Sequence, residues 1–512
     1  MRTGNVRTAG PREVELKFQL PPGSRAVLEA SGCFAGTPAT RRQLRTTYFD
    51  TADGALKAAG LTLRVRHNDE ARVQTVKSLP TGNGVASDRG EWEWPIRQDE
   101  PDTSLLAKVG PLASIVPVIE GRLRPMFVTA IDRTAHLLTL EGDTAVEVAF
   151  DAGTISADGA SEDVAEMELE LKGGPIGAFY RFAVDLHAEA PCWISSDSKA
   201  ARGWRLRGGA VKTAVRALPP VLKGAMQATD GAHALVEAAL GHIIANIGPT
   251  LRGDAEGLHQ LRLAVRGARA GLALFEQPLE RLAGPETADQ FCAGLQRFGA
   301  LLGTARDWDV FCLATVPAAM VALPQPGLQA LREAADTDRL TAHARVAAAL
   351  RGQDFSTLVL GLAAWANAGT VAGSDSRRER LWRVVPQLLD DAAAEVRHHG
   401  RHPGRLTAAQ RHQLRKSLKR LTYAVEQLGR HYTRRAVKAY GARCEALQDV
   451  LGAANDAIVG HKLALQLVTD GRPALADAAG ALAQWCDRRG RKTLHGLRPA
   501  VRKLFEAEAF WA

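Results

Sequence analysis

The spacing of apolar residues changes part-way along this chain of 512 residues. In the first two hundred residues apolar and polar side chains alternate, as in EVELKF at 13–18 and LTLRVR at 61–66. Because successive side chains of a strand point to opposite faces, this period of two predicts an antiparallel β domain. From about Ala225 the apolar residues recur at the helical spacing, which predicts an all-helical domain. One such segment, 233–248, runs into a Gly-Pro pair at Gly248-Pro249, where we expect its helix to end.

The boundary between the two patterns is expected at residues 208–224. This segment holds two glycines at one end, a Pro-Pro pair and a final glycine, which is the composition of a linker. The alternating pattern before it also includes RVQTVK at 72–77, EWEW at 91–94, TAVEVAF at 144–150 and EMELELK at 166–172. We therefore expect a multidomain protein whose helical domain occupies 225–512.

The charge and cysteine content narrow the partners and the compartment. Lys and Arg number 65 against 56 Asp and Glu, and the resulting charge of +9 favours an anionic partner without identifying it. The six cysteines form no CxxC pair, so neither a disulfide framework nor a zinc ribbon is indicated. The start of the sequence has no apolar leader segment, and the longest apolar run, 358–366, is too short to span a membrane. We expect a cytoplasmic, soluble protein with no membrane partner.

Charged residues of opposite sign are sorted onto different predicted strands. Glu13, Glu15 and Lys17 share one strand face, and Arg64 and Arg66 share another. A sheet with one solvated face would give the same alternation in any single strand. Segregated carboxylates and bases instead favour a site that holds metal and phosphate together, because Mg²⁺ or Mn²⁺ binds carboxylate and phosphate oxygens while Arg and Lys neutralise the remaining phosphate charge.

In their order these motifs resemble the CYTH domain of triphosphate tunnel metalloenzymes. The resemblance covers residues 11–207 and rests on ExExK at 13–17 followed by YFDTADGALKAAGLTLRVR, QTVK, EWEW, AFDAG and EMELELK. It implies an eight-stranded antiparallel β-tunnel that binds a triphosphate along its axis, with Mg²⁺ or Mn²⁺ as cofactor.

The resemblance also implies roles for individual residues. Four carboxylates would be metal ligands, directly or through water: Glu13, Glu15, Glu168 and Glu170. Six cations would line the phosphate track: Lys17, Arg64, Arg66, Lys77, Arg133 and Lys199. Four further carboxylates are candidates for catalysis or for the tunnel wall: Glu91, Glu93, Asp151 and Glu166.

The reaction varies within this family, and the motif alone leaves hydrolysis of inorganic triphosphate, hydrolysis of thiamine triphosphate and cyclisation of ATP open. The fusion to a helical domain resembles bacterial inorganic triphosphatases, so we expect a metal-dependent inorganic triphosphatase. A protein that binds polyphosphate without turnover, for example on polyphosphate granules, is the alternative. The presence of both carboxylate pairs favours the enzyme.

The helical half of the sequence contains an internal repeat. HQLR occurs at 259–262 and again at 412–415, and each copy is followed at similar spacing by a related segment, LGTARDWDV at 302–310 and LGAANDAIV at 451–459. A repeat of this length indicates a duplicated helical unit. We expect two pseudo-symmetric helical bundles that face each other.

Cations follow one stripe of each repeated helix. His259, Arg262, Arg266 and Arg269 lie at helical spacing, and so do His412, Arg415 and Lys419. A solvated face would give the same pattern, but cations side by side with few acids to pair them favour an anionic ligand. Aromatics make up only 5% of the chain, which argues against a nucleic acid whose bases would stack on rings.

These segments resemble the CHAD domain, the conserved-histidine α-helical domain, over about residues 225–512. The resemblance implies a basic surface that binds inorganic polyphosphate. The residues expected on it are His259, Arg262, Arg266, Arg269, Arg306, His412, Arg415, Lys416, Lys419 and Arg420. The second copy has Asn455 and Asp456 where the first has Arg306 and Asp307, so the role of Arg306 is not expected to be symmetrical. The sequence makes no prediction about oligomeric state.

Overall fold

The computed structural model divides into two compact units whose sequences interleave. It describes residues 12–68, 71–79, 84–208, 213–218, 220, 222–223, 226–275, 285–368 and 380–512, so the predicted linker at 208–224 lies partly outside the described residues. The barrel unit comprises Met1–Val215, Leu240–Arg252 and Ala349–Thr370. The helical unit comprises Arg216–Ala239, Gly253–Ala348 and Val371–Ala512.

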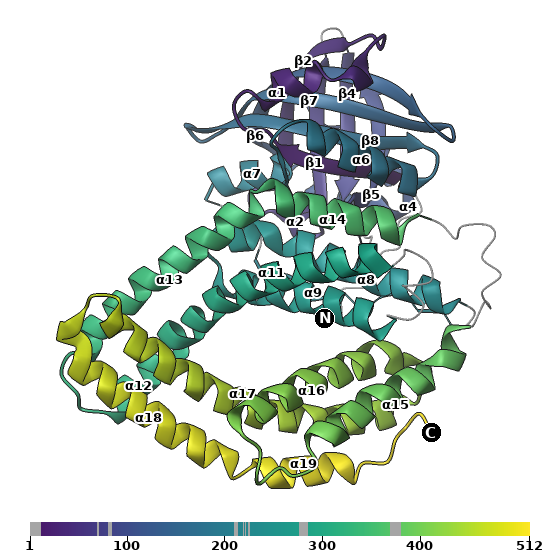
Figure 1. Ribbon diagram of the computed structural model, residues 1–512. Coiled ribbons are helices and arrows are strands. Elements are labelled where there is room, and N and C mark those ends of the chain that lie inside the picture. Colours follow the sequence, from purple (N-terminus) through teal and green to yellow (C-terminus); the bar gives the residue numbers. More distant parts are fainter. Residues whose placement is uncertain are drawn as a thin grey trace. The chain divides into compact units, whose positions relative to one another are not determined.

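The barrel unit contains a closed antiparallel sheet (Figure 1). Its strands are β1 (Arg12–Gln19), β2 (Thr40–Asp50), β3 (Leu61–Asn68), β4 (Ala71–Ser78), β5 (Ser87–Ile96), β6 (Arg124–Leu140), β7 (Thr144–Ala157) and β8 (Ala160–Gly173). They pair in the order β5-β4-β3-β2-β6-β7-β8-β1, and a further pairing of β1 with β5 closes the barrel. The predicted eight-stranded tunnel is confirmed.

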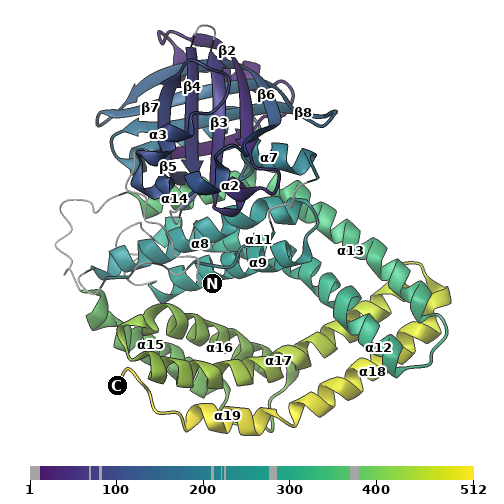
Figure 2. The ribbon, with the colours of Figure 1, turned by 180° about the vertical axis from the view of Figure 1, so that it is seen from behind.

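Alternation along the strands decides which side chains enter the barrel. In β8, Met167 and Leu169 are fully buried on the outer side, whereas Glu168 and Glu170 point inward. The outer face of β3, β4 and β5 is covered by short helices, as Figure 2 shows from behind. These helices are α2 (Ala55–Ala58), α3 (Thr103–Ala107), α4 (Gly110–Ala113) and α5 (Val116–Ile119). Apolar burial therefore lies outside the barrel, and the charged residues lie inside it.

Two helices that follow the sheet complete the barrel unit. They are α6 (Ile176–Glu189) and α7 (Lys199–Leu206), joined by the two-residue strand β9 (Trp193–Ile194), which pairs with β1. α6 packs against α14 (Gln353–Ala366), which lies far along the sequence. The contact is close, because a Cβ added at Gly177 of α6 would lie 2.2 Å from the carbonyl oxygen of Asn367.

Helix α8 (Ala228–Leu251) does not end where the sequence predicted. It continues through Gly248 and Pro249 to Leu251. The proline lies in the last turn, where its missing N–H costs one hydrogen bond, and Thr250 Oγ1 donates to the carbonyl oxygen of Asn246 at 2.7 Å. By length and hydropathy α8 is the one helix of the described residues that could cross a membrane, and 67% of its apolar window is buried, as in the core helix of a globular protein.

The helical unit is built around the sequence repeat. The first copy lies on α9 (Ala255–Leu274) and α11 (Pro285–Val310), and the second on α16 (Ala408–Leu428) and α17 (Arg434–Thr469). α9 contacts α16 and α11 contacts α17, so the two copies face each other as predicted. The remaining helices are α12 (Val316–Ala322), α13 (Leu328–Leu350), α15 (Leu381–His399), α18 (Ala476–Leu494) and α19 (Leu497–Phe505).

The close packing of α6 on α14 gives a test of the barrel unit. Gly177→Ala is expected to lower the free energy of unfolding by about 1–3 kcal/mol, because the added methyl group forces the two helices apart. Gly110→Ala is the matched control, since a Cβ there meets nothing within 4 Å. Urea denaturation followed by tryptophan fluorescence measures both, and equal stability of the two variants would contradict the packing described.

Candidate active site

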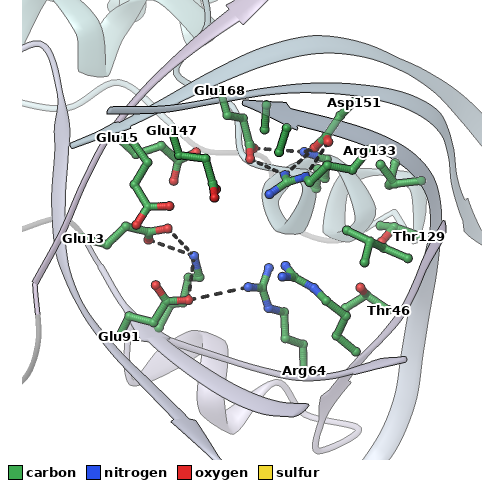
Figure 3. A pocket seen from close by; sticks show the side chains of 18 of the residues that line it. Glu13, Glu15, Thr46, Arg64, Glu91, Thr129, Arg133, Glu147, Asp151 and Glu168 are labelled. Carbon is green, nitrogen blue, oxygen red and sulfur yellow. Dashed lines mark hydrogen bonds and ion pairs between the residues drawn. The ribbon is translucent and has the colours of Figure 1, made fainter. Parts of the chain in front are cut away.

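The interior of the barrel is a cavity of about 450 Å³ lined by all eight strands and by the start of α7. Among the described residues, nine Lys and Arg side chains and eight carboxylates line it. The structure brings together thirteen of the residues expected in the tunnel: Glu13, Glu15, Lys17, Arg64, Arg66, Lys77, Glu91, Glu93, Arg133, Asp151, Glu168, Glu170 and Lys199. Figure 3 shows Glu13, Glu15 and Glu147 on one side of the cavity, with Thr46 and Thr129 on the other. The roles of these residues stay predictions.

One cluster of ion pairs surrounds Glu13. Its carboxylate accepts from Lys77 Nζ at 2.7 and 2.8 Å and from Arg89 Nε at 2.8 Å. Burial alone would raise the pKa of Glu13, but Lys77 and Arg89 lower it below its ordinary value. Lys77 also pairs with Glu91 at 2.9 Å, and Glu91 lies 3.6 Å from Arg64. Glu13 is therefore ionised and held in place by Lys77 and Arg89.

A second cluster surrounds Lys199, the first residue of α7. Lys199 Nζ lies 2.6 Å from Asp151 and 3.0 Å from Glu168. Arg133 contacts the same two carboxylates at 2.6 and 2.5 Å, and Lys17 pairs with Glu168. Burial opposes ionisation of Glu168, yet these three cations hold the pKa of Glu168 well below its ordinary value.

Glu166 does not line the cavity, unlike its neighbours on β8. Its side chain is fully buried behind Lys199, with which it pairs, and it lies 3.3 Å from Arg202 of α7. This position suits a residue that holds Lys199 from behind and does not suit one that touches a ligand in the tunnel.

Three carboxylates form a row across adjacent strands. Glu15 of β1 lies directly opposite Glu170 of β8, which lies opposite Glu147 of β7. Burial raises the pKa of Glu170, and the carboxylates of Glu13 and Glu147 act in the same direction against the single lysine Lys172. Glu15 is already paired with Lys17 and, at 2.8 Å, with Arg89, whereas Glu147 and Glu170 share Lys172. Two carboxylates that share one lysine fit a hard divalent cation. The ion would be held by Glu15, Glu147 and Glu170.

A second group of carboxylates also meets the distance requirement for a metal. Oxygens of Asp151, Glu166 and Glu168 lie within 4.8 Å of one another. Lys199 Nζ pairs with all three, so a metal there would have to displace a buried ammonium group. Glu147 and Glu170 of the row share one exposed lysine, Lys172, at 3.8 and 2.8 Å, so this end of the row fits a metal better.

Two arginines that face the cavity have incomplete hydrogen bonding. The Nε atoms of Arg64 and Arg66 are buried and have no hydrogen-bond partner among the described residues. Burial lowers the pKa of Arg66 to about 10, and the charges of Arg64 and Arg133 contribute. Burial would raise the pKa of the Tyr48 phenol beside them, but Arg64 and Lys199 lower it below its ordinary value. This side of the cavity favours an anion.

Sequence reasoning missed several residues of the cavity. Arg89 precedes Glu91 by two positions on β5, so the alternation already seen there pointed to it. Glu147 lies four residues before Asp151 on β7, so the same alternation places it on the inward face. Arg42 and Tyr48 lie on β2, whose mixed composition gave no clear period. These residues add two cations and one carboxylate to the expected set.

In the helical unit, the two repeats bring their cations to one place. Arg262 of α9 lies close enough to Arg415 and Lys419 of α16 to lower the pKa of both. Burial is the largest cause for each, and the pKa of Lys419 falls to about 7. Asp307 and Asp456 are the acidic residues that partly offset this charge. The cations of this cluster are half-buried and repel one another. A bound anion would relieve this repulsion.

The other predicted residues of this surface are arranged less uniformly. His259 lies beside the cluster, and Arg262 and Arg306 contribute to lowering its pKa after burial. Arg420 already has two other partners: it donates to the carbonyl oxygen of Ala273 at 3.0 Å and lies 3.5 Å from Glu395. Four others are exposed at the surface: Arg266, Arg269, His412 and Lys416.

Comparison with protein families decides the identity of both parts. Residues 11–204 match the CYTH domain, and residues 234–465 match the CHAD domain. The chain contains a CYTH domain and a CHAD domain. CYTH domains are metal-dependent enzymes that act on triphosphates. The boundaries expected from the sequence stay predictions, and α14 together with the second half of α8 belongs to the CHAD sequence while packing in the barrel unit.

Individual relatives match parts of the chain. An inorganic triphosphatase from Haemophilus influenzae is 29% identical over 205 residues, which are 38% of this chain and 55% of that protein. The chain thus matches about half the length of this curated relative. The crystal structure of the CHAD domain from the plant Ricinus communis is 24% identical, covers 56% of this chain and 96% of its own, and has a TM-score of 0.49. A putative adenylyl cyclase from Hippeastrum, described as having a dominant triphosphatase activity, is 20% identical, covers 39% and 97%, and has a TM-score of 0.30.

The lowered pKa of Lys419 predicts a change in stability with pH. Between pH 7 and about 10 the unfolded chain binds more protons at Lys419 than the folded protein does, so the free energy of unfolding should rise with pH in this window. Lys419→Met should remove this slope and raise the free energy of unfolding at pH 7 by about 1 kcal/mol or more. Lys416→Met, an exposed lysine on the same helix, is the control for chemical denaturation at pH 7 and pH 9. A destabilised Lys419→Met would contradict the assignment.

Proposed function

We propose that the CYTH domain hydrolyses inorganic triphosphate with Mg²⁺ or Mn²⁺. The observation that carries the proposal is the presence, in one cavity, of Arg64 and Arg66, whose buried Nε atoms have no hydrogen-bond partner among the described residues, and of the carboxylate row of Glu15, Glu147 and Glu170. The Haemophilus influenzae relative, an inorganic triphosphatase, supports the choice of substrate.

The charge of the cavity supports the need for metal. Its nine cations and eight carboxylates nearly cancel, so a triphosphate entering alone would leave a large excess of negative charge beside buried carboxylates. Divalent cations that arrive with the phosphate offset this excess. When bound, the metal supplies a Lewis acid that polarises a phosphoryl oxygen or lowers the pKa of a bound water.

The side chains of the chain itself have separate tasks in this proposal. Arg64 and Arg66 bind phosphate oxygens with their guanidinium groups, and the buried Tyr48 phenol lies beside them. Lys17 and Lys199 are held at the cavity wall by carboxylates, from which they reach phosphate oxygens without large movement. The closed barrel limits water, which strengthens these charge interactions.

Removal of one carboxylate of the row tests the proposal. The unsubstituted protein should release phosphate from triphosphate with Mg²⁺ or Mn²⁺ and stop when a chelator removes the metal. Glu170→Gln should lower kcat by about 100-fold, because the loss of a charged ligand weakens the metal site. Glu141→Gln, at an exposed turn between β6 and β7, is the control and should keep full activity.

The same assay distinguishes the other substrates. Thiamine triphosphate, ATP and long polyphosphate are offered at equal concentration with each metal. Faster turnover of thiamine triphosphate or ATP than of inorganic triphosphate would assign the tunnel to that substrate. No turnover of any of them, with Glu170→Gln indistinguishable from the unsubstituted protein, would contradict an enzymatic role and favour a protein that only binds phosphate.

For the CHAD domain we propose binding of inorganic polyphosphate. The support is the cluster of Arg262, Arg415 and Lys419, where two repeats face each other and where burial and neighbouring cations lower the pKa of Arg415 and Lys419. A polyanion placed between them would replace repulsion by attraction, and it needs no stacking of rings. A cytoplasmic location, with association to polyphosphate granules left open, stays a prediction of the sequence.

Charge reversal tests the polyphosphate proposal. Arg262→Glu with Arg415→Glu should abolish retention of polyphosphate in a filter-binding assay and leave triphosphate turnover unchanged. Arg332→Glu with Arg345→Glu changes the net charge equally at exposed positions on α13 and should retain polyphosphate. Retention by the first variant, or equal loss in both, would place the binding surface elsewhere. Retention by the unsubstituted protein should also fall steeply with salt.

A further inference from the structure

The segment that precedes Lys199 is held at several points by strand pairing and hydrogen bonds. This strap, defined here as residues 193–199, begins with β9, whose Ile194 pairs with Phe18 of β1. Ser195 N then donates to the carbonyl oxygen of Lys17 at 2.9 Å. The strap is thus attached to the strand that carries the ExExK motif.

Two other attachments come from the CHAD sequence, within the barrel unit. Ile194 N donates to Ser356 Oγ of α14 at 3.1 Å, and Ser356 is fully buried. Asp197 Oδ2 accepts from Arg252 Nη1 at 2.9 Å, just after the end of α8. Arg205 of α7 shares the same carboxylate at 3.1 Å. The strap is therefore clamped between its own helix and two CHAD residues.

Asp197 stands next to the start of α7, so its position controls where Lys199 begins. Ser198 caps α7 by accepting from Ala201 N at 3.1 Å, and Lys199 is the first residue of that helix. From there Lys199 reaches Asp151 and Glu168 and is 11% exposed. Movement of Asp197 would change the direction of the cap and carry Lys199 with it.

The end of α8 lies close to the strap at Gly248. A Cβ added at Gly248 would lie 2.9 Å from Asp197 Oδ1, 3.1 Å from Arg252 Nη1 and 3.3 Å from Ser196 Oγ. Only a glycine allows α8 to approach the Asp197 carboxylate this closely. The end of α8 therefore holds the strap in two ways: Arg252 pairs with Asp197, and Gly248 allows close packing.

We infer that Arg252, a residue of the CHAD sequence, is a positioning residue for the CYTH site: it holds Asp197 so that Lys199 points into the tunnel. The effect on turnover rests on the proposed triphosphatase function, whereas the position of Lys199 does not. The CHAD sequence then contributes to triphosphate chemistry through α8 as well as carrying its own anion surface.

The experiment compares Arg252→Gln with Arg252→Lys and with Arg122→Gln. Arg122 makes an exposed pair with Asp53 at 3.0 Å on the same unit and is the matched control. Arg252→Gln should raise KM for triphosphate about tenfold with a smaller change in kcat, because a phosphate-binding lysine is misplaced. Partial misfolding would lower kcat alone. Arg252→Lys should restore most of the affinity.

A second measurement reports the position of Lys199 without turnover. Brief acetylation with acetic anhydride, followed by mass spectrometry, should modify Lys199 severalfold more in Arg252→Gln than in the unsubstituted protein. Gly248→Ala, which keeps Arg252 but pushes the Asp197 carboxylate away, should act in the same direction. Gly480→Ala is its control, since a Cβ there meets nothing within 4 Å.

The outcomes separate this inference from the proposed function. Unchanged KM and unchanged Lys199 acetylation in folded Arg252→Gln would overturn the positioning role, and so would a loss of kcat with both of these unchanged. If the unsubstituted protein hydrolyses no triphosphate, the proposed function fails, and the acetylation ratio alone then supports or overturns the role of Arg252.

Discussion

Closing an antiparallel sheet into a barrel turns one face of every strand inward, and in this protein that face is charged. Seventeen Lys, Arg, Asp and Glu side chains line a cavity of about 450 Å³, and most are withdrawn from water. Buried charges are tolerated only when they are paired. The ion pairs of Glu13 with Lys77 and Arg89, and of Glu168 with Lys17, Lys199 and Arg133, are therefore a condition for the barrel to fold.

Pairing is incomplete at two places, and both have functional meaning. The Nε atoms of Arg64 and Arg66 have no hydrogen-bond partner in the part of the chain that the structure describes, and Glu147 and Glu170 share a single lysine, Lys172. The free energy that an anion and a metal gain there comes from charges that the fold already holds in position, so little reorganisation is needed on binding. In the CHAD cluster around Lys419 the fold likewise holds charges in position before a ligand binds. There the cations repel one another, and an anion would relieve that repulsion.

The barrel unit includes residues from the CHAD part of the sequence, so the two units do not correspond to two consecutive stretches of the chain. The end of α8 and the whole of α14 belong to the CHAD match, yet they pack in the barrel unit, at Asp197 and along α6. A CYTH segment expressed without them would lose Arg252 and Ser356 and expose the apolar face of α6. Fusion of the two domains in one chain therefore has a structural reason in addition to the phosphate binding that we propose for both.

Much of the fold and of the site could be predicted from the sequence. A period of two in six segments predicted six of the eight barrel strands, and the resemblance to the CYTH domain, together with this alternation, predicted thirteen of the residues that line the cavity. Glu166 broke this rule because the start of α7 lies over that part of β8 and buries it, which no strand pattern reveals. The predicted end of α8 at Gly248-Pro249 was wrong, because a proline in the last turn of a helix removes only one hydrogen bond. The attachment of α8 and α14 to the barrel unit depends on contacts far apart in the sequence, such as Asp197 with Arg252.

A crystal structure of the protein with triphosphate and Mn²⁺ would test the central claim most directly. Anomalous scattering locates the metal independently of the phosphate. The account predicts phosphate oxygens within hydrogen-bond distance of Arg64 and Arg66, and manganese at the row of Glu15, Glu147 and Glu170. Phosphate and metal bound outside the barrel, with the tunnel ion pairs unchanged, would contradict it.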